Sequence, residues 1–254
     1  MLSSRRIAFL GGSTALAVLA PADVSGDDAA DALGLSTQPR GLVVLNGTTE
    51  AIPRGRALAL RRAAEALAGV AVDERLTVLT GGTDAGIFGL FGRALGDRRT
   101  APCIGVAPLS AVTWPGRDGG ETGIADLVPL EPHHSHFLLV EGVEWGTETP
   151  ALIELSQTLA AERPSVVVLA GGGGGARREV LEQVRRGRQV LVLAGSGRFA
   201  DEVVAARDSG IAGDPVAAEL ATSTSITVIA VAEPAPLAAR VRAALGLAEA
   251  RSGS

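Results

Sequence analysis

The feature that most constrains the fold of this chain is a series of short apolar runs, each the length of one β-strand, separated by stretches with helical periodicity. Because nearly every residue in a run is apolar, the strands must be buried on both faces, as in a parallel sheet with helices on each side. The sequence predicts an α/β protein with a Rossmann-like, doubly wound, mostly parallel sheet. The predicted strands lie at residues 42–45, 76–79, 104–106, 137–140, 166–169, 190–193 and 226–231.

Near the N-terminus, two further apolar runs flank the step Gly11-Gly12. Such a step favours a β-hairpin, with strands at 6–10 and 14–20. The alternative is a secretory signal, because two arginines precede the apolar stretch, but glycines in its middle are not typical of one. We expect residues 1–40 to form a β-hairpin and a polar connection to the next domain.

Charge and residue usage exclude several classes of function. The formal net charge is -5, so we expect no nucleic-acid partner and no direct membrane contact. All 23 basic residues are arginine, which excludes a Schiff-base lysine, a P-loop lysine and a Tyr–Lys dehydrogenase pair. Cys103 is the single cysteine, so neither a disulfide framework nor a thiolate metal cluster is expected. No apolar run reaches the ~20 residues of a membrane span, and we expect a soluble, cytoplasmic protein.

Three of the predicted strands end in glycine-rich turns, and each turn leads into a predicted helix. The turns lie at 80–86, 171–175 and 195–198. Exposed backbone N–H groups at a helix N-terminus bind anions, and Arg177 and Arg198 can add bidentate phosphate contacts. Tight packing of helix on strand explains any one such turn equally well. Three convergent turns favour a phosphate or nucleotide ligand, although their spacing matches neither a Gly-x-Gly-x-x-Gly dinucleotide motif nor a Walker loop.

Glycines also recur every third residue along one face of the helix predicted after the first turn, at Gly86, Gly89 and Gly92. A glycine inside a helix costs about 1 kcal/mol relative to alanine. We therefore expect the sheet or a ligand to approach this helix backbone closely, with Asp84 as the N-cap residue.

Two other polar segments are candidates for the site. Residues 46–49 follow a predicted strand, and they either contact a phosphate or ribose or cap the next helix. All three histidines, His133, His134 and His136, lie at the start of another predicted strand. We expect no metal there, because too few carboxylates or thiols lie at ligand spacing. Contact with a ligand and hydrogen bonding to the adjacent loop both remain open for these histidines.

The segment from Trp114 to Pro132 is rich in glycine and aspartate and has no apolar period. A loop of this length in a compact domain is either a lid over the site or a surface excursion. Arg117 lies in this loop. It is either a solvated charge or a group that closes over a pyrophosphate.

Four segments of the chain carry motifs that occur together in one known superfamily. They are Thr80-Gly-Gly-Thr-Asp-Ala-Gly-Ile87, Ile104-Gly-Val-Ala-Pro108, His133-His-Ser-His-Phe-Leu-Leu-Val140 and Gly195-Ser-Gly-Arg-Phe-Ala-Asp201. In this order they resemble the SLOG/LSDAT superfamily, and most closely the prokaryotic relatives of the N-terminal domain of TRPM channels. The resemblance runs from about residue 41 to residue 246, and we assign residues 41–250 to a nucleotide-ligand-binding domain.

The resemblance implies a Rossmann-like domain that binds a nucleotide-derived ligand such as ADP-ribose or an NAD derivative, largely as a sensor and with no cofactor required. Because no effector domain is visible, a sensor of this kind would signal through an effector partner protein or by forming a homo-oligomer. The candidate ligand-binding residues are Gly47, Thr48, Gly81, Gly82, Thr83, Asp84, Gly86, His134, His136, Gly172, Gly173, Gly174, Gly175, Arg177, Gly195, Ser196, Gly197, Arg198 and Asp201.

A second branch of the superfamily, the LOG-type phosphoribohydrolases, cleaves nucleoside monophosphates at the N-glycosidic bond and carries a Pro-Gly-Gly-x-Gly-Thr-x-x-Glu motif. Residues 171–179 resemble it, except that Gly171 replaces the proline and Ala176 replaces the threonine. The resemblance implies a catalytic Glu179 at the ribosyl centre. A register shifted by one residue places Arg178 there instead, and Glu179 can equally complement the helix dipole. We expect binding, with hydrolysis as the alternative.

Overall fold

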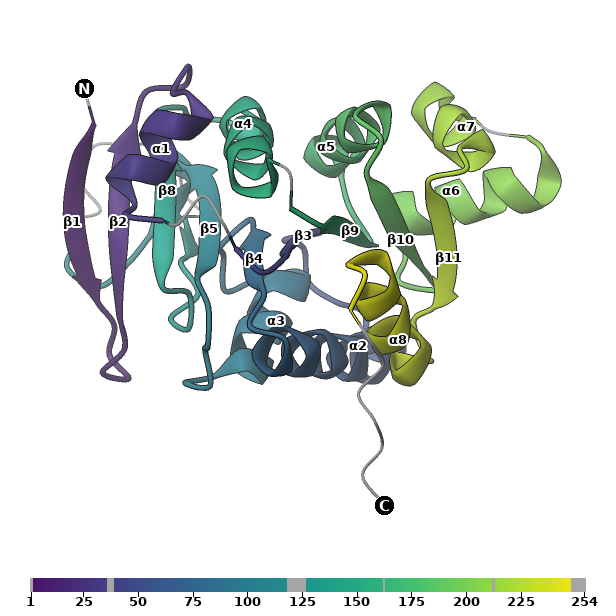
Figure 1. The fold of residues 1–254 in the computed structure, drawn as a ribbon, viewed down its shortest axis with the longest axis horizontal. Coiled ribbons are helices and arrows are strands. Elements are labelled where there is room, and N and C mark those ends of the chain that lie inside the picture. The colour runs from purple at the N-terminus through teal and green to yellow at the C-terminus, as the bar shows by residue number, and fades with distance from the viewer. Residues whose placement is uncertain (1, 36–38, 118–126, 162, 212, 248–254) are drawn as a thin grey trace.

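The computed structural model describes residues 2–35, 39–117, 127–161, 163–211 and 213–247, and Figure 1 shows its ribbon. Nine strands form one sheet in the order β1-β2-β8-β5-β4-β3-β9-β10-β11. All neighbouring strands in this sheet are parallel except β1 and β2. The predicted doubly wound, mostly parallel sheet is confirmed.

Each of the seven predicted apolar runs forms a strand of this sheet, and no end shifts by more than two residues. Alternate residues of one central strand enter different cores: Leu42 and Val44 pack into one, and Val43 and Leu45 pack into the other. The continuous apolar pattern thus reflects burial on both faces. The strands are β3 (Leu42–Gly47), β4 (Thr77–Thr80), β5 (Cys103–Pro108), β8 (His136–Val140), β9 (Ser165–Ala170), β10 (Gln189–Ala194) and β11 (Ile226–Ala230).

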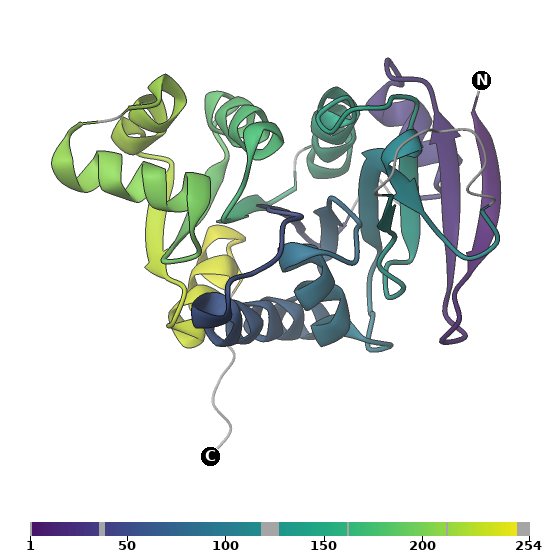
Figure 2. The same ribbon diagram turned by 180° about the vertical axis from the view of Figure 1, so that it is seen from behind.

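Two layers of helices cover the two faces of the sheet, as Figures 1 and 2 show from opposite sides. One layer consists of α1 (Gly26–Ala32), α4 (Thr149–Ala160), α5 (Gly174–Arg185), α6 (Arg198–Ser209) and α7 (Pro215–Thr222). The other consists of α2 (Arg54–Asp73), α3 (Gly86–Leu95) and α8 (Pro234–Ala244). Among the described residues, no helix combines the length and the apolar character that a membrane span requires.

The predicted N-terminal hairpin is present, and it extends the main sheet. β1 (Ser3–Ala8) pairs antiparallel with β2 (Thr14–Ala20), and β2 pairs in parallel with β8. The predicted bounds of the first strand, 6–10, are wrong at both ends. The chain turns at Phe9, whose N–H donates to the carbonyl of Ser13.

A helix, α1, lies in the segment that the sequence suggested to be a polar connection. Ser25 caps it, with a side chain that accepts a hydrogen bond from the N–H of Asp28. Ala29 and Ala30 are fully buried, and the helix packs against α4. Seven residues with an acidic first turn carry too little apolar periodicity for a helix to be predicted.

The loop predicted over 114–132 is described only in part. Residues 118–126 lie outside the described residues, and the choice between a lid and a surface excursion depends on them. The flanking segments form a small parallel pair, β6 (Val112–Thr113) and β7 (Val128–Pro129), which the 3-10 helix η1 (Leu109–Ala111) precedes.

Arg117 is tied to this region by backbone contacts. Its guanidinium donates to the carbonyl oxygens of Leu109 and Val112. It also lies over the indole ring of Trp114, 4.6 Å from the ring centroid. Arg117 is thus a structural cation of the loop base, neither freely solvated nor part of the cavity described below.

Candidate functional site

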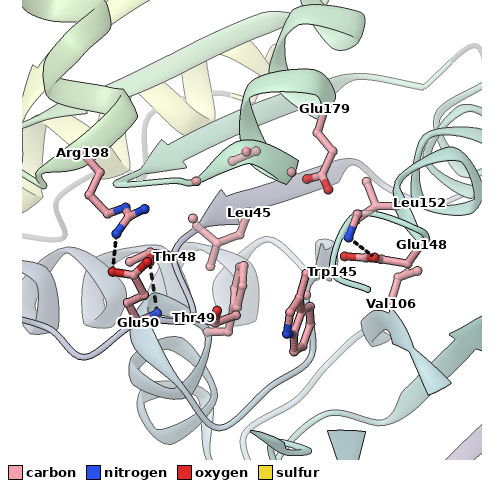
Figure 3. Close-up of a pocket in the computed structure, with 18 residues that line it drawn as sticks. Leu45, Thr48, Thr49, Glu50, Val106, Trp145, Glu148, Leu152, Glu179 and Arg198 are labelled. Atoms are coloured by element: carbon pink, nitrogen blue, oxygen red, sulfur yellow. Dashed lines mark hydrogen bonds and ion pairs between the residues drawn. The ribbon is translucent and has the colours of Figure 1, made fainter. Parts of the chain in front are cut away.

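The chain changes its direction across the sheet between β3 and β9. From β3 it continues to β4, β5 and β8, and it then returns to form β9 on the other side of β3. Ligands of doubly wound proteins bind beyond the carboxyl ends of the strands at such a switch point. A cavity of about 270 Å³ lies there (Figure 3). Its lining residues are Leu45, Gly47, Thr48, Thr49, Glu50, Gly81, Phe88, Val106, Trp145, Gly146, Glu148, Leu152, Gly173, Gly174, Gly175, Ala176, Glu179 and Arg198.

One wall of the cavity is the start of α5. Gly173 is the N-cap of this helix, and Gly173, Gly174, Gly175 and Ala176 all line the cavity. The N–H groups in the first turn of a helix have no acceptor within the helix, so they can donate to a ligand. The second glycine-rich turn therefore presents a row of backbone donors to the cavity.

Arg198 lines the cavity from the first residue of α6. Its Nε donates to the carbonyl of Gly172 at 3.2 Å, and its guanidinium pairs with the carboxylate of Glu50 (Figure 3). The backbone of Arg198 has a φ of +52°, in the left-handed region that residues other than glycine seldom adopt. Strain of this kind is typical of residues that a functional site holds in place.

The third glycine-rich turn braces the second. Ser196 Oγ accepts a hydrogen bond from the N–H of Gly171 at 2.8 Å and donates to the carbonyl of Leu193. The N–H of Ala200, in the first turn of α6, donates to the carbonyl of Gly171 at 2.9 Å. The N–H of Ala200 therefore already has an acceptor within the protein and is not available to a ligand. Arg198 is the residue of the third turn that lines the cavity.

Gly195, Gly197 and Asp201 are not among the residues that line the cavity. Asp201 accepts a hydrogen bond from the N–H of Gly195 at 2.7 Å and forms an ion pair with Arg56 at 3.6 Å. A side chain on Gly197 would meet the guanidinium of the same arginine. These three residues hold α2 and α6 together next to the site.

Arg177 points away from the cavity. Its guanidinium pairs with the carboxylates of Asp214 and Glu202. It also lies over the ring of Phe199, 4.9 Å from the centroid. Of the two arginines predicted to hold a phosphate, Arg198 is the one placed in the cavity.

Glu179 is a buried carboxylate at the cavity, 8% exposed. One of its oxygens accepts a hydrogen bond from Asn46 Nδ2, and the other accepts one from Thr149 Oγ1 at 3.1 Å. Burial raises the pKa of Glu179 to about 7, and the nearby charge of Glu148 adds to the rise. Glu179 is thus held inside the site and is not a solvated glutamate that only complements the helix dipole.

Glu148 is a second buried carboxylate in the cavity, and it was not predicted from the sequence. Its Oε2 accepts a hydrogen bond from the N–H of Gly146 at 2.7 Å, and burial raises its pKa. It directly precedes α4. Residues 144–149, which follow β8, contain two glutamates and two threonines. Because the carboxyl ends of parallel strands lie at one edge of the sheet, this position after a strand could have indicated a site residue.

The turn after β3 supplies polar groups to the cavity without capping a helix. Thr48 Oγ1 accepts a hydrogen bond from the N–H of Glu50 at 3.0 Å, and the N-cap of α2 is Pro53. Capping by the threonines, the alternative considered above, is therefore wrong. A side chain on Gly47 would come within 2.8 Å of the carbonyl oxygen of Ala170, so glycine is needed where β3 and β9 approach.

The first glycine-rich turn reaches the cavity at one residue, Gly81. Gly82 packs on the backbone of β5, and Thr83 is fully buried. Asp84 forms an ion pair with Arg93 and does not cap α3, whose N-cap is the following residue.

The predicted close approach to the glycine face of α3 is present, but the sheet and a ligand are not its source. The carbonyl oxygen of Thr48 occupies the place of a side chain on Gly86. The carboxylate of Glu131 occupies the place of a side chain on Gly92. A loop and a buried side chain therefore require these glycines.

His134 and His136 are not among the residues that line the cavity. His134 is fully buried, with Nδ1 2.8 Å from Glu131 Oε2 and Nε2 2.8 Å from Thr80 Oγ1. Thr80 Oγ1 also accepts a hydrogen bond from the N–H of Gly82, so this network fixes the first glycine-rich turn. Within the described ranges, no group of three or more His, Cys, Asp or Glu side chains is arranged to hold a metal ion.

The part of the cavity away from Arg198 has apolar side chains beside the carboxylates of Glu148 and Glu179. Leu45 of β3, Phe88 of α3, Val106 of β5 and Leu152 of α4 line it together with Trp145. The cavity thus has a guanidinium at one end, and at the other end the apolar side chains lie together with the carboxylates of Glu148 and Glu179 (Figure 3).

Comparison with known proteins bears on the motif resemblance. No curated protein shows a significant match to the chain. A model of the family described as "SLOG in TRPM, prokaryote" matches residues 40–239. The matched segment includes the strands and turns that surround the cavity. The chain therefore belongs to this prokaryotic family of SLOG domains related to the one in TRPM.

Proposed function

We propose that this protein binds a nucleotide-derived ligand of the ADP-ribose or NAD class in the switch-point cavity. Its family indicates a nucleotide-related binding or processing role in general terms. The observation that carries the proposal is one cavity that combines the donors of α5 and Arg198 with two buried carboxylates. A phosphate would bind to the donors. Ribose hydroxyls would donate to Glu148 and Glu179.

We propose further that the protein is a cytoplasmic sensor and that binding needs no metal or cofactor. An anionic ligand competes with Glu50 for Arg198, so binding would release the turn after β3 from α6. This local change would carry ligand occupancy to an effector protein or to a second copy of the chain.

Replacing Arg198 with lysine is expected to weaken the binding of ADP-ribose and NAD about ten- to a hundredfold. A guanidinium grips two phosphate oxygens, whereas an ammonium offers one point charge. Loss of a charge-assisted contact corresponds to about 1.5–3 kcal/mol. Isothermal titration calorimetry on the wild type and Arg198→Lys measures the difference directly.

Arg177→Lys is the matched control, because Arg177 lies near the start of the neighbouring helix α5 but is paired outside the cavity. This variant should keep the affinity of the wild type. If the wild type binds neither nucleotide at millimolar concentration, the proposed function is wrong. Unchanged affinity in Arg198→Lys would instead assign the phosphate to the backbone donors of α5.

A second candidate function is hydrolysis of the N-glycosidic bond of a bound nucleotide. The observation that favours it is the presence of Glu148 next to Glu179 in one buried site. Cleavage at a glycosidic centre commonly uses one carboxyl group as an acid and a second as a base or stabilising charge. Glu179, with a pKa raised to about 7, can hold a proton at neutral pH.

The two functions differ in their products. If the protein is a binding protein, incubation with AMP, NAD or ADP-ribose should release no free base above background, as measured by chromatography. Base release that is lost in Glu179→Gln, with nucleotide binding retained, would establish hydrolysis instead. Glu233→Gln, a change at an exposed glutamate outside the cavity, should match the wild type in the same assay.

A further inference from the structure

We propose that Trp145 is the platform on which the base of the bound nucleotide stacks, so that the ligand lies with its base toward Trp145 and its phosphate toward Arg198. This inference rests on the proposed function and adds an orientation and a ligand requirement to it. The ligand must carry an aromatic base, and a sugar phosphate alone would leave Trp145 without a stacking partner.

The first observation is the exposure of Trp145. Among the described residues, five large apolar side chains are exposed, and Trp145, at 43%, is the one that lines the cavity. The other tryptophan, Trp114, is 8% exposed and packs in a core. Burying an indole stabilises a protein, so an exposed indole in a concave site is the feature expected of an aromatic binding surface.

The second observation is that the backbone around Trp145 is fixed while its side chain is open. The N–H of Gly146 donates to Glu148 Oε2 at 2.7 Å, and the N–H of Thr147 donates to the carbonyl of Glu144 at 3.2 Å. Gly146 also has a left-handed φ of +101°, and a side chain there would collide with the guanidinium of Arg178. With the backbone fixed, only the two side-chain torsions of Trp145 remain to be ordered when a ligand stacks on the ring.

The third observation is the order of chemical groups along the cavity. Figure 3 shows Arg198 and Glu50 on one side of the cavity and Trp145, Val106, Glu148 and Glu179 toward the other, with Leu45 between the two groups. The guanidinium that can hold a phosphate therefore lies apart from the indole, and the carboxylates that can accept from ribose hydroxyls lie at the same end as the indole. A nucleotide with its phosphate at Arg198 would have its base at the end with Trp145.

The test compares AMP with ribose 5-phosphate, which has the same sugar and phosphate but no base. The chain has two tryptophans and no tyrosine, so its intrinsic emission comes from Trp114 and Trp145. AMP should quench the emission of the wild type, and ribose 5-phosphate should not. In Trp145→Phe, which keeps a ring and leaves buried Trp114 as the emitter, the quenching should disappear.

Calorimetry on Trp145→Ala measures the contribution of the ring to affinity. AMP should bind about five- to a hundredfold more weakly, the range seen when an aromatic stacking partner is removed. Ribose 5-phosphate should bind as it does to the wild type, and Trp145→Phe should restore most of the AMP affinity. The same variants assayed with ribose 5-phosphate serve as the control for a correctly folded site.

The outcomes separate this inference from the proposed function. If both ligands bind the wild type but AMP affinity is equal in Trp145→Ala, Trp145 is not the base platform and the proposed function stands. In that case its exposure fits a protein partner that docks on Trp145 and exposed Val143. If neither ligand binds the wild type and ADP-ribose also fails, both the inference and the proposed function are wrong.

Discussion

Replacing Glu131 with alanine is expected to lower the free energy of unfolding by about 3–5 kcal/mol, the cost of removing one partner from a buried charge pair. Glu131 is fully buried. Its carboxylate accepts hydrogen bonds from the N–H of His133 at 2.8 Å and lies within 2.8 Å of Nδ1 of both His133 and His134. Without the carboxylate, His134 would be a buried cation with no counter-charge from this residue.

The pKa shifts of the pair give this effect a pH dependence. Burial opposes the charged form of both groups, but mutual contact lowers the pKa of Glu131, and contact with Cys103 and Glu131 raises that of His134. The contribution of Glu131 is present above its ordinary pKa and is lost as the pH falls through its lowered value. The contribution of His134 is present below its ordinary pKa and is lost as the pH rises through its raised value.

Urea denaturation at neutral pH, between these two limits, measures the loss in Glu131→Ala. Glu65→Ala is the control, because Glu65 forms an exposed ion pair with Arg61 on the surface of α2 and should contribute at most about 1 kcal/mol. A loss below about 1 kcal/mol in Glu131→Ala would show that the pair is not the stabilising element described here.

Glu179→Gln is expected to become more stable relative to the wild type as the pH rises. The folded-state pKa of about 7 is above the ordinary value of 4.5, so between these values the unfolded state releases its proton first. The stability that the protonated carboxyl contributes is present below the ordinary pKa and is lost as the pH rises through 7. Glutamine stays neutral, so the difference in the free energy of unfolding should grow by about 2–3 kcal/mol between pH 5 and pH 8.

Denaturation curves for the wild type and Glu179→Gln at several pH values measure this growth. The altered hydrogen bonds to Asn46 and Thr149 add an offset that does not change with pH, so the slope and not the offset is diagnostic. Glu233→Gln, at an exposed position, should run parallel to the wild type. A pH-independent difference for Glu179→Gln would mean that Glu179 titrates normally in the folded protein.

The fold could be predicted because its determinants are local. An uninterrupted apolar run such as Leu42–Leu45 fits one environment, a strand buried on both faces, and repetition of such runs with helices between them leaves few arrangements. Helix α1 could not be predicted in the same way. Its formation depends on a packing partner, α4, that lies more than a hundred residues further along the chain.

The candidate site was predictable where backbone geometry defines it and not where side chains meet across the fold. Glycine-rich turns such as Gly173–Gly175 and the arginine after the third turn, Arg198, carry a local signature, and both line the cavity. The contact of Asn46 with Glu179 joins residues 133 positions apart. Glu148 comes from a segment without glycine motifs, so only the convergence of strand ends brings it to Glu179.

The family match begins at residue 40, after the hairpin of β1 and β2, yet this hairpin covers β8 along the whole length of that strand. Phe137, Leu138, Leu139 and Val140 of β8 are all fully buried. Without β2, this apolar strand would present a row of unpaired N–H and C=O groups, which is a template for strands of other molecules. With the hairpin in place, the sheet ends at β1, whose Arg5 and Arg6 are exposed. The first 20 residues thus cover the open edge of β8 and replace it with an edge strand that carries two exposed charges, and this strand lies outside the residues that the family model matches.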